Sequence, residues 1–520
     1  MLLVRVLCFA LTAILAALNP PMQSLKRFPT PLDWSSVKKY AHRIRFISQP
    51  ASFSLPRLDD AALATLITPS NFGTLFPSLR ALDYSVISVA APMVHLLTKV
   101  LSTERHLESM TTLCVICPRA SQREEVYDLF QAIRTKGTRL ETLRIESFTS
   151  TGSNSTLAVK LLEGEFKYLR KLELSWTIHV SAECLTCLAG MEYLQEMNLC
   201  MRRDIGLDFL VNGCHSTKDH TRVTSKRTFP VLKSLKVMAH SLDQCTALIS
   251  LVTSHFLDSI TFSYDEQAPS ALIEAFFRQV RNTCQDAVTA STSTVLSPSR
   301  TISLTLKHNL GPYSSAAPPF LVHPSQTLSP LLALRHLRTL RLLHLGTIAI
   351  DDGFLREAAN AWGARLQELE ECGIPWVGVE ESNDLPGFVA ATLDGVGEFV
   401  RRCPRLERLR LAFDGRDVPR PHEHPDEHLG IQGSRERQQG DDACEVDSSQ
   451  ESGQSRSAPI SSSALQVLNV RDSPIDNPEG VAKFLKRVAP VLRVICVEGS
   501  LDMWRKWREV EDRMKLTGSC

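Results

Sequence analysis

The pattern that decides the fold is seen in Leu140-Glu-Thr-Leu143-Arg-Ile145: apolar, two variable residues, apolar, one variable residue, apolar. The same pattern returns along the chain, with first residues at Leu140, Leu169, Leu194, Leu232, Leu257, Leu337, Leu406, Leu465 and Leu492. Weaker copies begin at Ala41, Leu79, Leu107 and Leu366, and a strand-like run extends from Ile302 to Leu306. Recurrence of this kind favours a repeat architecture over a set of independent domains.

The spacing of the copies and the residues between them predict the architecture. From Leu107 to Leu257 the first residues are 25 to 38 positions apart, near or above the usual length of about 20–29 residues for a leucine-rich repeat. Between copies, apolar residues recur at helical spacing, as in Ile273, Phe276 and Val280. We therefore predict an α/β leucine-rich-repeat solenoid of about 12–13 irregular repeats, with a curved parallel sheet inside and helices outside.

The same pattern predicts a recognition surface. Side chains alternate between the two faces of a strand, so the residue between the second and third apolar positions points away from the core. Across the stack these residues form the inner, concave row Arg144, Glu173, Asn198, Lys236, Thr261, Arg341, Arg410 and Asn469. A neighbouring row adds Glu146, Ser175, Met238 and Arg471.

Solenoids commonly bind proteins along such a row. Arginine often dominates the energy of an interface, so we expect Arg341 and Arg410 to contribute most. Reversing both to Glu is expected to abolish binding, while the melting temperature stays almost unchanged.

Composition and charge narrow the classes of function. The 520 residues carry 58 basic and 57 acidic side chains, a net charge of +1. This balance gives no support for a nucleic-acid or membrane-surface partner. The sequence contains no GxxxxGK[ST], GxSxG or HExxH motif, so no phosphate loop, nucleophile elbow or zinc pair is predicted. We expect a binding protein with no cofactor, and not an enzyme.

The cysteines and histidines give no metal site that we would assign. Cys8, Cys184, Cys200, Cys245 and Cys496 lie among apolar neighbours, as reduced, buried cysteines do. The pairs Cys114/Cys117 and Cys184/Cys187 have zinc-type spacing, but the second is predicted to lie on a helix with Cys184 on its apolar face. His422, His424 and His428 lie in a polar stretch with no rigid geometry. Asn154 begins a glycosylation sequon, which matters only in a secreted chain.

Changes in composition divide the chain into four parts. Residues 1–27 are an apolar segment, 28–413 the main solenoid, 414–461 a polar insert, and 462–520 the last repeats with a helical cap. The insert is too poor in apolar residues to fold by itself. In the cap, Leu501, Trp504, Val510 and Met514 are predicted to share one helical face.

The N-terminal segment leaves the compartment open. An uncharged run from Val6 to Leu18 follows Arg5, which suits either a buried helix or a secretory signal peptide. The scattered cysteines favour a cytoplasmic or nuclear protein, whereas residues 1–18, if a signal, would make it a secreted one.

Near the N-terminus the chain reads Pro31-Leu32-Asp33-Trp34, followed by Tyr40-Ala41-His42-Arg43-Ile44-Arg45. With this stretch as the most specific part, residues 28 to 515 resemble the leucine-rich-repeat proteins of fungal, basidiomycete-type F-box families. The resemblance implies a substrate receptor of an SCF-type ubiquitin ligase, in which an F-box binds the Skp adaptor and cullin while the repeats bind the protein substrate. The segment before Pro31 contains no recognisable F-box, so no adaptor-binding residue is assigned, and weak or no adaptor binding is expected. The alternatives are a repeat scaffold with no ubiquitin role and a secreted recognition protein.

Overall fold

A computed structural model describes residues 45–47, 80–83, 110–117, 131, 139–147, 166–175, 178–201, 203, 228–289, 301–309, 322–372, 391–419, 463–516 and 518–519. Its contacts divide the chain into two compact units, unit 1 (Met1–Thr347) and unit 2 (Ile348–Cys520).

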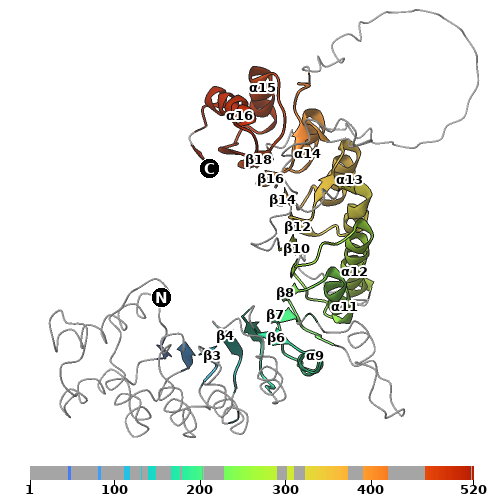
Figure 1. Cartoon of the computed structure of the whole chain (residues 1–520), viewed down its shortest axis with the longest axis vertical. Helices are drawn as coiled ribbons and strands as arrows, with labels where there is room; N and C mark the ends of the chain where they lie inside the picture. Colours follow the sequence, from blue (N-terminus) through green and yellow to red (C-terminus); the bar gives the residue numbers. More distant parts are fainter. Residues whose placement is uncertain are drawn as a thin grey trace, which may run out of the picture. The chain divides into compact units, whose positions relative to one another are not determined.

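Unit 1 is built on a parallel sheet whose strands follow one another in chain order (Figure 1). The strands are β1 (Phe46–Ile47), β2 (Ala81–Asp83), β3 (Thr112–Cys117), β4 (Thr142–Ser147), β5 (Lys171–Leu174), β7 (Glu196–Met201), β8 (Ser234–Ala239), β9 (Ser259–Tyr264), β10 (Ile302–His308) and β12 (Leu337–Leu343). The short β6 (His179–Val180) pairs with β7. Two further strands are β11 (Val322–Pro324) and β13 (Thr347–Ala349), the latter spanning the division between the units.

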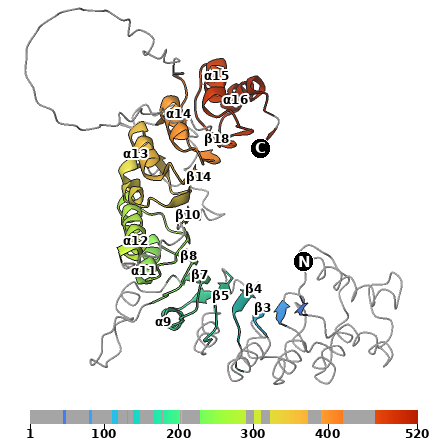
Figure 2. The same ribbon diagram turned by 180° about the vertical axis from the view of Figure 1, so that it is seen from behind.

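Helices cover one face of the unit 1 sheet (Figures 1 and 2). They are α9 (Ala182–Ala189), α11 (Leu242–Leu251), α12 (Ser270–Thr289) and the 3₁₀ helix η4 (Ser325–Ala333). Helix α11 packs against β8 and β9, and α12 packs between α11 and η4. At the start of α11 a capping box joins Ser241 and Gln244, which satisfies backbone N–H groups that the first turn leaves without partners.

Unit 2 repeats this strand-and-helix arrangement. Its parallel sheet has the order β14 (Glu368–Cys372), β16 (Arg408–Arg410), β18 (Val467–Arg471), β19 (Val494–Val497) and β20 (Gly518–Ser519). A separate pair is formed by β15 (Ala391–Thr392) and β17 (Phe413–Asp414). The helices are α13 (Asp352–Trp362), α14 (Leu393–Arg402), α15 (Pro478–Val488) and α16 (Leu501–Met514), each packed on the next. A side chain at Gly397 would collide with Phe484, so this glycine lets α14 and α15 approach closely.

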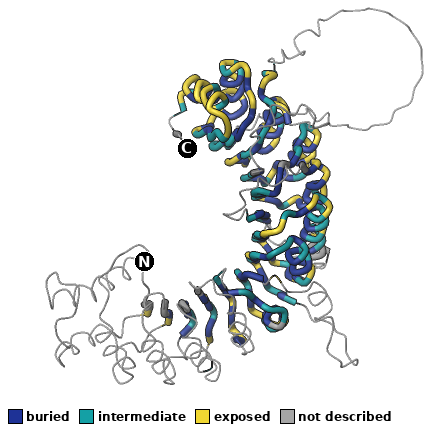
Figure 3. The backbone as a smooth tube through the Cα atoms, viewed as in Figure 1, coloured by how far each residue is buried: buried dark blue, intermediate teal, exposed yellow. Residues whose placement is uncertain are grey.

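The core lies between the strands and the helices, where the buried residues of Figure 3 concentrate. Strand β9 alternates strictly, with Ile260, Phe262 and Tyr264 at most 1% exposed and the residues between them half-buried. The predicted helix face of Ile273, Phe276, Phe277 and Val280 is buried in α12. Alternation on the strand and a stripe on the helix thus bury the apolar residues of both elements in one layer.

The expected α/β class and the parallel sheet are confirmed, but two weak copies of the motif were placed wrongly. Register pairs Leu113 with Leu143, so the unit that we began at Leu107 begins at Met110, which is 1% exposed. Likewise Ile47 pairs with Leu82, which shifts the copy assigned to Ala41 by three residues. In both stretches a second apolar residue, three positions later, also fits the first position of the short motif, so the sequence alone did not fix where the copy begins.

The predicted C-terminal face was also wrong in part. Leu501 and Trp504 are 65% and 49% exposed, whereas Trp507 and Val510 are fully buried. The Trp507 indole donates a hydrogen bond to the Ser473 carbonyl at 2.8 Å, which fixes this side of α16 against the sheet.

Several predictions concern residues that are only partly described, or not at all. Asp414, assigned to the insert, lies in β17, and the described chain continues to residue 419. The rest of the insert, its histidines, the N-terminal segment with Cys8, the Pro31 to Arg45 segment except for Arg45, and the Asn154 sequon lie outside the described residues.

Candidate functional site

The face of each sheet opposite the helices, called here the open face, carries the predicted recognition row. In unit 1 the register places five predicted residues directly opposite one another on successive strands, in the order Arg144, Glu173, Asn198, Lys236 and Thr261. Arg341 continues the row on β12, after Thr305 on β10. In unit 2, Arg410 pairs with Asn469. The predicted geometry of the row is therefore present within each unit, while its role in binding remains a prediction.

Several members of the row were missed, among them Thr305, Glu370 and Cys496. Thr305 stands between Thr261 and Arg341, and Glu370 stands opposite Arg410. The run from Ile302 lacks the two-residue spacer of the full motif, so the strand was recognised but no row residue was assigned. At Leu366 the third apolar position is taken by Glu371, which weakened the match.

A chain of ion pairs neutralises the first part of the open face. Glu173 pairs with Arg144 at 3.5 Å and with Lys171 at 3.0 Å, and Lys171 also reaches Glu196 at 2.9 Å. Hydrogen bonds to Glu196 and Glu173 raise the pKa of Lys171, so its charge is held firmly. Because these residues are partly exposed, each pair contributes little stability. Their charges already have partners across β4, β5 and β7.

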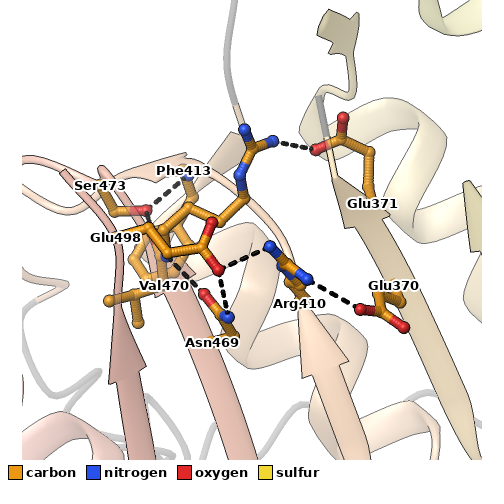
Figure 4. Close-up of polar contacts among 9 residues, drawn as sticks. Glu370, Glu371, Arg410, Phe413, Asn469, Val470, Ser473 and Glu498 are labelled. Atoms are coloured by element: carbon orange, nitrogen blue, oxygen red, sulfur yellow. Dashed lines mark hydrogen bonds and ion pairs between the residues drawn. The ribbon is translucent and has the colours of Figure 1, made fainter. Parts of the chain in front are cut away.

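Unit 2 contains a tighter polar cluster, drawn in Figure 4. The Arg410 guanidinium donates to Glu370 Oε1 at 2.9 Å and to Glu498 Oε1 at 2.5 Å. The Asn469 amide donates to the same Glu498 oxygen at 3.0 Å. Burial alone would raise the pKa of Glu498, but the hydrogen bonds from Asn469 and Arg410 outweigh it and lower the pKa. Arg410 and Asn469 thus hold unit 2 together across its strands.

Arg471 contradicts the predicted second row. Its side chain is 1% exposed and forms an ion pair at 2.8 Å with Glu371, which is 2% exposed. A bulge between Asn469 and Arg471 interrupts the alternation, and Arg471 has a left-handed φ of 53°. The inserted residue turns this side chain away from the open face into the interior.

The other three residues of that row lie in or beside strands of unit 1. Met238 is half-buried between Cys200 and Ser263. Glu146 stands opposite Ile116 in β4. Ser175 follows β5 and donates its backbone N–H to the Ile145 carbonyl at 2.8 Å.

Most of the described cysteines are buried, but Cys187 and Cys496 are half-buried. Cys184, Cys200 and Cys245 are buried, as expected, and burial raises the pKa of Cys200 to about 12. Cys496, by contrast, is half-buried and disulfide-bonded, so its prediction as a reduced core residue was wrong. It stands opposite Asn469 in the open-face row, where apolar neighbours in sequence do not imply burial. Within the described ranges, no cluster of His, Cys, Asp and Glu could hold a metal ion.

A serine–histidine pair in unit 1 serves the fold. His323 is fully buried, its Nδ1 lies 2.7 Å from Ser270 Oγ, and its Nε2 lies 2.9 Å from the Leu345 carbonyl oxygen. The carbonyl can only accept, so Nε2 donates and Nδ1 accepts from the Ser270 hydroxyl. Burial lowers the pKa of His323, which favours this neutral form. The pair fixes the start of α12 against β11.

Among the described residues, no helix has the length and apolar character needed to cross a membrane. Comparison of the sequence with protein-family models finds no match, and a search of curated proteins finds no relative.

Proposed function

We propose that this chain is a leucine-rich-repeat solenoid that recognises another protein through its open face. The observation that carries the proposal is the row of side chains from Arg144 to Arg341, held in register on successive parallel strands of unit 1. The described helices all pack on the other face, so none of them covers the row (Figures 1 and 2). An array of polar side chains on a rigid sheet is suited to a protein surface rather than to a small molecule, which needs a concave pocket.

The resemblance to F-box proteins supports one biological role for such a surface. In this role the chain is the substrate receptor of an SCF-type ubiquitin ligase, and the bound protein is the one to be ubiquitinated. A repeat scaffold with no ubiquitin transfer would use the same face. Loss of the chain should lengthen the lifetime of the bound protein if it is a ligase substrate, and should leave that lifetime unchanged if the chain is a scaffold.

The disulfide at Cys496 favours a second candidate, a secreted recognition protein. Disulfides persist in oxidising compartments and are rare in the cytosol. A thiol-labelling assay on protein taken directly from cells, with and without prior reduction, would find Cys496 blocked in the secreted protein and reactive in a cytosolic one.

Site-specific photo-crosslinking tests the binding function. A crosslinking amino acid replaces Asn198 or Thr261 on the open face, and in a control it replaces the exposed Arg278 on α12. We expect both open-face positions to capture the same protein and the α12 position not to capture it. Capture from Arg278 alone would move the binding surface to the helices and contradict the proposal.

A further inference from the structure

Four strands of unit 1 display an unusual floor on their open face. Register aligns Ser234, Ser259, Ser303 and Thr339 in one row across β8, β9, β10 and β12. Thr261 and Thr305 occupy the middle of the next row. All six are half-buried, and their hydroxyls make no hydrogen bond to any described part of the protein. We call these six residues the hydroxyl floor. Its donors are short and fixed by the sheet, and each of the six residues is only partly buried.

Three cations surround the hydroxyl floor. Lys236 and Arg341 stand at the two ends of the row that contains Thr261 and Thr305, and Lys307 stands one row further along β10. Lys236 and Lys307 form no ion pair within the described ranges. Strand β9 itself contains no acidic residue. Asp258 and Asp265 lie just before and just after it, and therefore outside the floor. Lys236 and Lys307 therefore make the floor cationic, whereas the charged residues on β4, β5 and β7 are paired with one another.

We propose that this surface binds an extended acidic segment, rich in Asp and Glu, of the protein that the open face recognises. Hydroxyl groups and lysines donate hydrogen bonds, and carboxylates accept them, most strongly when both partners are charged. Lys236 and Arg341 are separated by three strand intervals, or about 14 Å between their backbones. Cations spread over this distance suit several carboxylates along a chain better than one phosphate, which is bound by converging groups.

The chemistry of the floor disfavours a nucleic acid. Single strands bind through aromatic side chains on which bases stack. The residues of β8, β9, β10 and β12 that face the opening are Ser, Thr, Lys, Arg, Met and Leu, and they include no aromatic ring. Half-buried Met238 and Leu343 at the sides of the floor could contact apolar residues of a polypeptide.

The experiment uses the full chain and a fluorescent peptide of alternating Glu and Ser, with binding measured by anisotropy at several salt concentrations. Lys236→Glu with Lys307→Glu should weaken binding at least about tenfold, because two attractions become repulsions. The matched control, Arg170→Glu with Lys233→Glu, makes the same change of charge at exposed residues that precede β5 and β8. The control should stay within about twofold of the parent, because exposed charges outside a contact are largely screened by salt.

A second variant tests the hydroxyls without changing charge. Thr261→Val with Thr305→Val keeps the shape and the strand propensity of both residues but removes two donors. Binding should weaken several-fold, with the melting temperature kept as the check on folding. Three results would each overturn the proposal of an acidic ligand. The first is an equal loss of affinity in the Arg170→Glu, Lys233→Glu control, and the second is no binding of the acidic peptide. The third is tighter binding of a phosphoserine peptide or an oligonucleotide.

This inference rests on the proposed function, and the two can fail separately. If the acidic peptide does not bind but Asn198 and Thr261 still capture one protein, then recognition by the open face stands and the acidic partner is wrong. If neither position captures a protein, both fall.

Discussion

The buried ion pair of Arg471 and Glu371 makes unit 2 sensitive to a single substitution. Both side chains are at most 2% exposed and lie 2.8 Å apart. Arg471→Met should lower the free energy of unfolding by about 3–5 kcal/mol, because it leaves the Glu371 carboxylate buried without its cation. Urea denaturation measures this. The exposed Arg493, just before β19, provides the control, and Arg493→Met should cost under about 0.5 kcal/mol. Adding Glu371→Gln to Arg471→Met should recover part of the loss.

The structure changes the expected effect of Arg410→Glu on stability. Its guanidinium lies between the carboxylates of Glu370 and Glu498. Arg410→Glu would bring a third carboxylate into this group, so we expect it to lower the melting temperature by several degrees, contrary to the expectation of an unchanged stability. Arg410→Met should destabilise the protein less, since it adds no like charge. A melting temperature equal to that of the parent in the Glu variant would show that the cluster contributes nothing to folding.

His323 predicts a dependence of stability on pH. Burial lowers its pKa in the folded protein, below the value of about 6.5 for an unfolded histidine. The unfolded chain therefore takes up a proton first as the pH falls. Stability is fully present above about pH 6.5 and declines as the pH falls toward the lower folded pKa. His323→Gln cannot titrate and should flatten this decline in urea titrations, whereas an unchanged decline would show that His323 is not its source.

At the scale of single residues, the sequence predicted positions better than environments. Alternation correctly placed Arg144 and Lys236 on the open face. It failed at Arg471, because a bulge changes the face of every residue after it and leaves no mark in an apolar pattern. It could not show that Arg410 has two acidic neighbours, because Glu370 and Glu498 come from strands that are distant in sequence.

At the scale of an element, α16 contains its own matched pair of tryptophans. Trp507 is fully buried and packs edge-on against Phe413 with 6.0 Å between ring centroids, whereas Trp504 is 49% exposed. Trp507→Ala should cost about 3–5 kcal/mol of stability, since it opens a large cavity. Trp504→Ala should cost under about 0.5 kcal/mol in the same thermal unfolding experiment. Equal effects of the two would mean that α16 does not pack as described.

Helix α12, which has one clear apolar stripe, was predicted well, and α16 was not. In α12 the apolar residues Ile273, Phe276 and Val280 fall on a single face that the structure buries. In α16, Leu501 and Trp504 make an apolar stripe with Val510 and Met514 that competes with the face of Trp507. The hydrogen bond from Trp507 to Ser473 belongs to tertiary packing, which no local pattern contains.

At the scale of the whole molecule, the parallel sheet was predictable because the repeat is written many times and errors in single copies do not change the class. The division into two units was not predicted, since the motif continues on both sides of Thr347.

The polar insert provides a test of the predicted domain boundaries. Replacing residues 421–461 by a short Gly/Ser linker should leave the free energy of unfolding nearly unchanged, because loop closure depends only weakly on length. A large loss in urea denaturation would show that these residues belong to the folded core.

The strict alternation of strands such as β9 has a consequence for evolution. Along such a strand, the residues that secure the fold alternate with the residues that we propose to contact a partner, so substitution of one set places little constraint on the other. Specificity can therefore drift while foldability is preserved, and a gene family built on this scaffold could diversify its targets by changing only every second codon within short strands. A combinatorial library randomised at the hydroxyl floor should accordingly yield mostly folded members with many different affinities.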